Sequence, residues 1–117
     1  AATLATGEYL LYCDDDDTFT PNALALAREA VTTEPGIPHI FRMHHPTFGV
    51  LWQRPALVCG NVGTPMFAAP RDTRLAQWND GYPDAYQGDY RFIARTVANH
   101  GGCCGWQEGI VCNVGRV

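Results

Sequence analysis

Four consecutive aspartates, Asp14, Asp15, Asp16 and Asp17, are the residues of this chain best suited to chemistry. Adjacent carboxylates repel each other, so either solvent or a divalent cation must screen their charge. The run is therefore either a solvated acidic loop or a site where two carboxylates bind a metal ion. It directly follows the apolar stretch "YLLYC", and ligands of open α/β sheets gather at the carboxyl ends of strands. This position favours a site for Mg²⁺ or Mn²⁺.

The segments on either side of the aspartates predict a strand and a helix. Residues 9–13 form a continuous apolar run, which is typical of a strand covered on both faces. Thr20 and Pro21 predict a helix start, with Thr20 as the N-cap and Pro21 at the first helical position. Apolar residues then recur at helical spacing up to residue 32, at Leu24, Ala27 and Val31.

The rest of the chain alternates between strand and helix patterns. Residues 37–45 predict a strand, and residues 50–53 return beside it as a hairpin. Residues 55–71 predict two short strands around a glycine-rich loop. A second helix begins at Asp89 and ends at Gly101 and Gly102; its apolar stripe consists of Tyr90, Ile93, Ala94 and Val97.

A closing strand over residues 106–114 completes this order. The order predicts one α/β domain over residues 1–117, with a mixed β-sheet and flanking helices.

Composition excludes several classes of protein. The 117 residues are 46% hydrophobic and 17% charged, which is typical of a globular domain. The net charge is -4, and the eight basic residues are scattered arginines, so a nucleic-acid surface is not expected. No segment is apolar over the ~18 residues that a membrane helix needs. The five cysteines, an odd number without a CxxC motif, indicate reduced and mostly buried thiols in a cytoplasmic protein.

The stretch "GEYLLYCDDDDTFTPNAL" resembles the segment around the DXD motif of A-type (GT-A fold) glycosyltransferases, family two in particular. Further along, "GNVGTPMFAAPRD" resembles the strand and loop beside that family's acceptor site. "GDYRFIARTVANHGG" resembles the helix that carries its catalytic base. The resemblance covers nearly all of the chain. It implies a partial GT-A (nucleotide-diphospho-sugar transferase) fold that begins just before the DXD motif.

The resemblance implies a role for each acidic residue that it covers. Asp14 and Asp16 take the two acidic places of DXD, and Asp16 would coordinate the Mn²⁺ or Mg²⁺ that bridges the diphosphate of a nucleotide-sugar donor. Asp14 or Asp15 would contact the ribose or the water shell of the metal. Asp89 would be the general base for a hydroxyl-bearing acceptor, such as a saccharide, with inversion at the anomeric carbon. An aspartate that opens a helix is also an ordinary N-cap, and both roles stay open for Asp89.

The family's N-terminal nucleotide-binding half, which would precede the DXD motif, is not among these 117 residues. Without it, a strand that is apolar on both faces would expose an edge. We therefore expect a fragment, a degenerate copy, or a chain that forms a homo-oligomer or pairs with the missing half. The function is then a metal-dependent inverting glycosyltransferase or part of one, or a non-catalytic binding or assembly module derived from it. A calcium-binding EF-hand fits worst, because its sixth and twelfth loop positions would hold Phe19 and Ala25.

Overall fold

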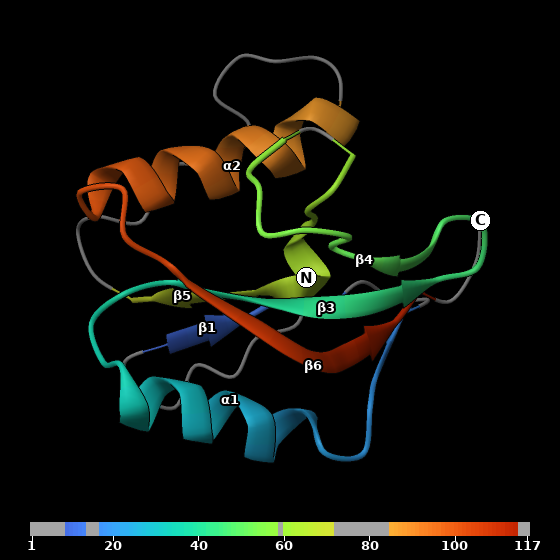
Figure 1. Ribbon diagram of the computed structural model, residues 1–117, viewed down its shortest axis with the longest axis horizontal. Coiled ribbons are helices and arrows are strands. Elements are labelled where there is room, and N and C mark those ends of the chain that lie inside the picture. Colours follow the sequence, from blue (N-terminus) through green and yellow to red (C-terminus); the bar gives the residue numbers. More distant parts are fainter. Residues whose placement is uncertain (1–8, 14–16, 59, 72–84, 115–117) are drawn as a thin grey trace.

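The computed structural model describes residues 9–13, 17–58, 60–71 and 85–114, and for residues 85–89 it describes the backbone only. Figure 1 shows a curved sheet with one helix on either side. The elements in chain order are β1 (Tyr9–Leu11), β2 (Thr18–Phe19), α1 (Ala23–Thr33), β3 (His39–His45), β4 (Gly49–Leu51), the 3-10 helix η1 (Thr64–Met66), β5 (Phe67–Pro70), α2 (Ala85–Asn99) and β6 (Gly105–Asn113).

The sheet is mixed, with the strand order β1-β5-β3-β6-β2 and with β4 attached to β3. β3 and β6 run parallel, whereas β1–β5, β5–β3, β3–β4 and β2–β6 are antiparallel. Two antiparallel pairings relate β1 to β3, so β1 runs in the same direction as β3 and β6. The carboxyl end of β1, which the aspartates follow in sequence, therefore faces the same end of the sheet as the ends of β3 and β6.

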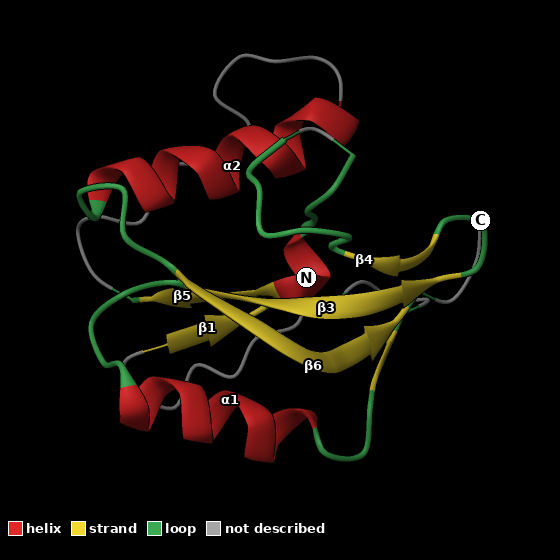
Figure 2. Cartoon of the chain, viewed as in Figure 1, coloured by secondary structure: helices red, strands yellow, loops and turns green. Residues whose placement is uncertain are grey.

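The two helices lie on opposite faces of the sheet, α1 against β6 and α2 above η1 and β5 (Figure 2). The largest fully buried side chains come from the middle strands, η1 and α2: Phe41, Phe67, Ile40, Met66 and Ile93. The predicted α/β class, with a mixed sheet and flanking helices, is confirmed. Neither described helix is long and apolar enough to cross a membrane.

Helix α1 begins two residues later than the Thr20-Pro21 signal predicts, with Asn22 rather than Thr20 at the N-cap. The Thr20 hydroxyl donates instead to the carbonyl oxygen of Ile110 at 2.8 Å, where β2 meets β6. The predicted apolar stripe is also shifted. Leu24 is 45% exposed, while the buried face consists of Ala23, Ala27 and Ala30.

Small side chains on that face let α1 lie close to the sheet. A Cβ added at Gly109 of β6 would approach the Leu26 side chain to 2.8 Å. α1 therefore buries the face whose side chains are small enough for the helix to approach the sheet, and not the face with the largest apolar side chains.

The first strand is shorter and more peripheral than its apolar sequence predicts. β1 covers three of the five predicted residues, and it pairs with β5 along one edge in the described part of the chain. Tyr9 and Leu10 are half-buried and only Leu11 is buried. The prediction of a strand covered on both faces is therefore wrong for the described residues.

In residues 55–71, the described residues form one strand, β5, where two were predicted. The first half of that segment is an irregular loop organised by the buried side chain of Asn61. Asn61 accepts a hydrogen bond from the backbone N–H of Gln53 (2.9 Å) and donates to the carbonyl oxygens of Arg54 and Ala56 (both 2.8 Å). A side chain that satisfies backbone groups in this way replaces the ladder of a second strand.

His39 connects the end of α1 to the sheet interior and is fully buried. Its Nε2 donates to the Glu34 carbonyl oxygen at 2.9 Å, and its Nδ1 lies 3.3 Å from the amide nitrogen of Gln107. Because a carbonyl can only accept, these partners fit the neutral tautomer with its proton on Nε2. Both ring nitrogens have a structural partner, so His39 serves the fold.

The end of α2 agrees with its sequence signal. Gly101 and Gly102 have φ angles of 73° and 80°, and the Gly102 N–H donates back to the Val97 carbonyl oxygen at 2.9 Å. This left-handed conformation ends the helix at low cost only with glycine.

The cysteines depart from the prediction of mostly buried thiols. Of the described cysteines Cys13, Cys103, Cys104 and Cys112, only Cys112 is buried, and Cys103 is exposed. Burial, and secondly the neighbouring Cys103, raise the pKa of the Cys104 thiol. Cys104 therefore stays protonated at neutral pH.

Candidate functional site

Asp14, Asp15 and Asp16 lie outside the described residues, so the site is built from the residues around them. On one side, Tyr12 and Cys13 continue the chain from the end of β1; on the other, Asp17 leads into β2. The Cys13 Sγ lies 3.5 Å from the carbonyl oxygen of Asp17. Cys13, which precedes the acidic run, and Asp17, the last residue of the run, are thus in contact.

Three aromatic rings join the end of β1 to α2 and β5. The Tyr12 ring meets the Phe92 ring edge-to-face, with centroids 5.7 Å apart and planes at 82°. The Phe92 ring meets Phe67 in the same way, at 5.8 Å and 85°. We call Tyr12, Phe67 and Phe92 the aromatic junction. It places the carboxyl end of β1 against the helix that contains Asp89.

Burial also affects the pKa of the outermost ring of this junction. It raises the pKa of the Tyr12 phenol above its ordinary value. Tyr12 is therefore neutral at physiological pH and adds no negative charge beside the acidic run. Its hydroxyl keeps its proton and can donate a hydrogen bond.

Asp89 lies inside α2 and not at its start. The helix begins at Ala85 and Asp89 is four residues further along, so the N-cap interpretation of Asp89 is wrong. Asp89 precedes Phe92 by three residues, and positions three apart share a helix face. The backbone of Asp89 is therefore one turn from the aromatic junction, while its side chain lies outside the described part.

The predicted DXD aspartates and the predicted base thus flank the aromatic junction along the chain. Asp14 follows Tyr12 by two residues, and Asp89 precedes Phe92 by three. An aspartate inside a helix also has low intrinsic helix propensity.

Carboxylate oxygens are the donors that Mg²⁺ and Mn²⁺ prefer, so the acidic run fits a hard dication by its chemistry. Among the described side chains, in residues 9–13, 17–58, 60–71 and 90–114, no three His, Cys, Asp or Glu come close enough to hold a metal ion. Any metal site of this kind therefore includes side chains outside the described part, and Asp14, Asp15 and Asp16 are among them.

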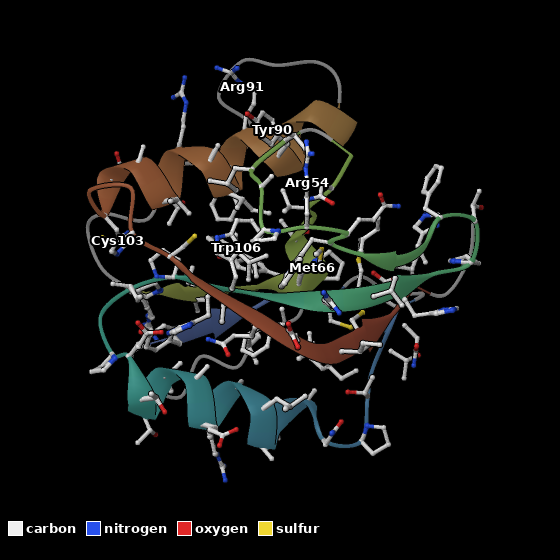
Figure 3. The ribbon with its side chains drawn as sticks, viewed as in Figure 1. Arg54, Met66, Tyr90, Arg91, Cys103 and Trp106 are labelled. Carbon is white, nitrogen blue, oxygen red and sulfur yellow. The ribbon has the colours of Figure 1, made fainter. Side chains whose placement is uncertain are left out.

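The outer face of α2 carries a shallow pocket of about 190 Å³, lined by Tyr90, Arg91, Ala94, Arg95 and Ala98. The sequence pattern predicts Tyr90 and Ala94 in the core stripe of this helix, and both line the surface pocket. Tyr90 is partly buried and also packs against the core, as predicted. The buried positions are Phe92, Ile93, Thr96 and Val97. Figure 3 shows Arg91 on the side of α2 that faces away from the sheet.

The sequence did not indicate Tyr12, Phe67 and Phe92 as residues that position the site. Each looks like an ordinary apolar residue in its own element. Their edge-to-face contacts join segments far apart in the chain, and no local period carries that information.

Phe92→Ala should lower the free energy of unfolding by about 3–5 kcal/mol, because it leaves a cavity in the aromatic junction. Phe92→Leu keeps most of the volume but loses two ring contacts, so about 1–3 kcal/mol is expected. Urea denaturation measures both variants. Phe48→Ala is the matched control, because Phe48 is 58% exposed and should change the free energy by about 0.5 kcal/mol or less. Equal losses for Phe92→Ala and Phe48→Ala would show that the junction does not hold the fold together.

Comparison of the chain with protein-family models, with curated proteins and with solved structures found no match.

Proposed function

We propose that this chain is a metal-dependent inverting glycosyltransferase, or the acceptor-side part of one, with a partial GT-A fold. The observation that supports the proposal is the aromatic junction. Its ring contacts bring the end of β1, with the acidic run two residues further along the chain, against the helix turn next to Asp89. A diphosphate-binding group and a base must face each other across the reacting carbon in such an enzyme.

In this proposal, Asp14, Asp15, Asp16 and Asp89 each have a role. Asp14 and Asp16 would hold Mn²⁺ or Mg²⁺, with Asp15 beside the ribose or the metal's water shell. When bound, the metal neutralises the negative charge that builds up on the departing diphosphate. Asp89 takes the proton from the acceptor hydroxyl as that oxygen attacks the anomeric carbon. The new bond forms on the face opposite the leaving group, which inverts the configuration.

A further feature supports part of this proposal. β1 lies at an edge of the sheet in the described part of the chain, which suits pairing with further strands or with a second copy.

A second candidate is a non-catalytic binding module on the same fold. The observation that favours it is a group of exposed apolar side chains around β4, namely Phe48, Val50 and Val58. Such a group is typical of protein contacts rather than of a sugar-transfer site.

Calorimetric titration distinguishes the two candidates. The chain is titrated with uridine diphosphate, guanosine diphosphate and inorganic pyrophosphate, each with Mn²⁺, with Mg²⁺ and with EDTA. A transferase should bind at least one of these ligands with either metal, and none with EDTA. Pyrophosphate tests the diphosphate site without requiring contacts to a base. No binding of any ligand under either metal would leave the non-catalytic candidate.

A further inference from the structure

Two tyrosines at the first strand, Tyr9 within β1 and Tyr12 directly after it, lie on opposite sides of the sheet. Tyr9 lies near the end of α1, with its ring centroid 6.2 Å from that of His39. Tyr12 lies on the side of α2, where its ring meets Phe92 edge-to-face. Side chains alternate along an extended backbone, so positions three apart point to opposite faces.

The hydroxyl groups of these two tyrosines differ in their hydrogen bonds. The Tyr9 hydroxyl donates to the carbonyl oxygen of Ile37 at 2.9 Å and accepts from the backbone N–H of Gly36 at 2.8 Å. Its donor and an acceptor site are therefore both used by the fold. In the described part of the chain, the Tyr12 hydroxyl has no hydrogen-bond partner, and it is not one of the described side-chain atoms that are buried without one. The half-buried Tyr12 therefore keeps its polar end in contact with solvent.

The aromatic junction determines where this hydroxyl lies. The Tyr12 ring packs on Phe92, and Phe92 packs on Phe67, so the ring is held between the end of β1 and α2. Asp14 follows Tyr12 by two residues, and Asp89 precedes Phe92 by three. Ligands of open α/β sheets gather at the carboxyl ends of strands, which is where Tyr12 lies. The fold thus places a hydroxyl that it does not itself use next to the proposed site.

The chemistry of a phenol complements that of the acidic run. Carboxylates only accept hydrogen bonds, so they cannot bind the oxygens of a phosphate directly. A metal ion can bridge the two, but a phosphoryl group has further oxygens that still need donors. A phenol supplies one donor and no negative charge, and a hydrogen bond to an ionised oxygen is stronger than one between neutral groups.

We propose that the Tyr12 hydroxyl contacts the ligand directly and donates a hydrogen bond to a phosphoryl oxygen of the diphosphate. This inference rests on the proposed function, because the acidic run must hold that diphosphate through its metal. It adds a binding residue from the other side of the run to the carboxylates. Tyr9, on the same strand, has a structural role only.

The two tyrosines provide a matched pair of variants. Tyr12→Phe and Tyr9→Phe each remove one oxygen atom and keep the ring. Calorimetric titration with inorganic pyrophosphate and Mg²⁺ measures the affinity of the native chain and of both variants. Tyr12→Phe should weaken binding by about ten-fold, the usual effect of one hydrogen bond to a charged group. Tyr9→Phe should leave the affinity within about two-fold of the native value.

Thermal unfolding in EDTA should show the opposite order. Tyr9→Phe should lower the midpoint of unfolding, because Gly36 and Ile37 lose their partner. Tyr12→Phe should leave the midpoint unchanged, because the contact with Phe92 remains. Equal weakening of pyrophosphate binding by both variants would overturn the inference, since any lost hydroxyl on this strand would then have the same effect.

NMR provides a second measurement that needs no variant. In a chain with ¹³C at the Cζ of tyrosine, pyrophosphate with Mg²⁺ should shift the signal of Tyr12 and leave that of Tyr9 in place. A shift of Tyr9 alone, or of neither residue, would overturn the inference.

The native chain also separates this inference from the proposed function. If the native chain binds pyrophosphate and Tyr12→Phe binds it equally well, the role of Tyr12 is wrong and the metal-diphosphate site stands. If the native chain binds neither pyrophosphate nor a nucleoside diphosphate with either metal, the proposed function fails, and the role of Tyr12 fails with it.

Discussion

Asp89→Asn is expected to lower the rate of sugar transfer by about 10²–10⁴-fold, because the variant cannot accept the proton of the acceptor hydroxyl. Asparagine has the same size and shape as aspartate, so the backbone of α2 should not move. The measurement is release of nucleoside diphosphate from a set of uridine- and guanosine-diphosphate sugars, with Mn²⁺ and simple saccharides as acceptors. A loss made only in the transition state appears in kcat and not in donor affinity.

The control for Asp89→Asn is Glu29→Gln, which removes the same charge from an exposed position on α1. This variant should keep the full rate. Unchanged turnover in Asp89→Asn would exclude Asp89 as the base. A parallel loss of metal-dependent diphosphate binding would instead show that Asp89 shapes the donor site.

Asp16→Ala is expected to weaken Mn²⁺-dependent binding of uridine diphosphate by about 100-fold or more, since even partners of metal ligands commonly contribute 10–100-fold. Stability should not fall in the same way. Removing one of four adjacent like charges relieves repulsion in the metal-free chain. The expected result is therefore lost binding with an unchanged or higher midpoint of thermal unfolding in EDTA.

Calorimetry and thermal denaturation on the same samples measure both effects of Asp16→Ala. Glu29→Ala serves as the control, because it removes one negative charge far from the run in sequence and should retain binding. If Asp16→Ala binds the diphosphate as the native chain does, the metal assignment is wrong. If the native chain binds equally well in EDTA, the acidic run has no part in binding through a metal.

Sequence patterns were reliable where one local interaction decides the structure. The two glycines after α2 end that helix because left-handed backbone favours glycine, and the closing strand lies within one residue of the predicted ends. The patterns failed where a distant partner decides. Thr20 has the chemistry of a cap, but its hydroxyl reaches the Ile110 carbonyl oxygen of β6. Leu24 fits a core stripe, but a close helix–sheet approach selects alanines instead.

The features of the candidate site also separate into those that local sequence predicts and those that distant contacts decide. The acidic run was found from residue type and position alone, because four adjacent carboxylates after an apolar run need a physical explanation. The segment before Asn61 was misassigned, because its amide side chain satisfies backbone groups that a second strand would have paired. The contact between Tyr12 and Phe92 could not be predicted, since two aromatic residues in separate elements have many other packing partners. The sequence predicts a helix start at Asp89, because aspartate is an ordinary N-cap and the apolar stripe follows it. In the structure, α2 begins at Ala85.

The pairing pattern of the sheet also determines how this chain can fold. Ile40 pairs with both Trp106 and Phe67, Phe19 with Cys112 and Leu10 with Ala69, so four strand pairings join segments distant in the chain. Among the described strands, only the β3–β4 hairpin is local. Loop-closure entropy must be overcome before such distant contacts form, so domains with this topology fold slowly for their size. During synthesis, β3 cannot gain its parallel neighbour until β6 has left the ribosome, whereas the β3–β4 hairpin can form as soon as its own residues have emerged.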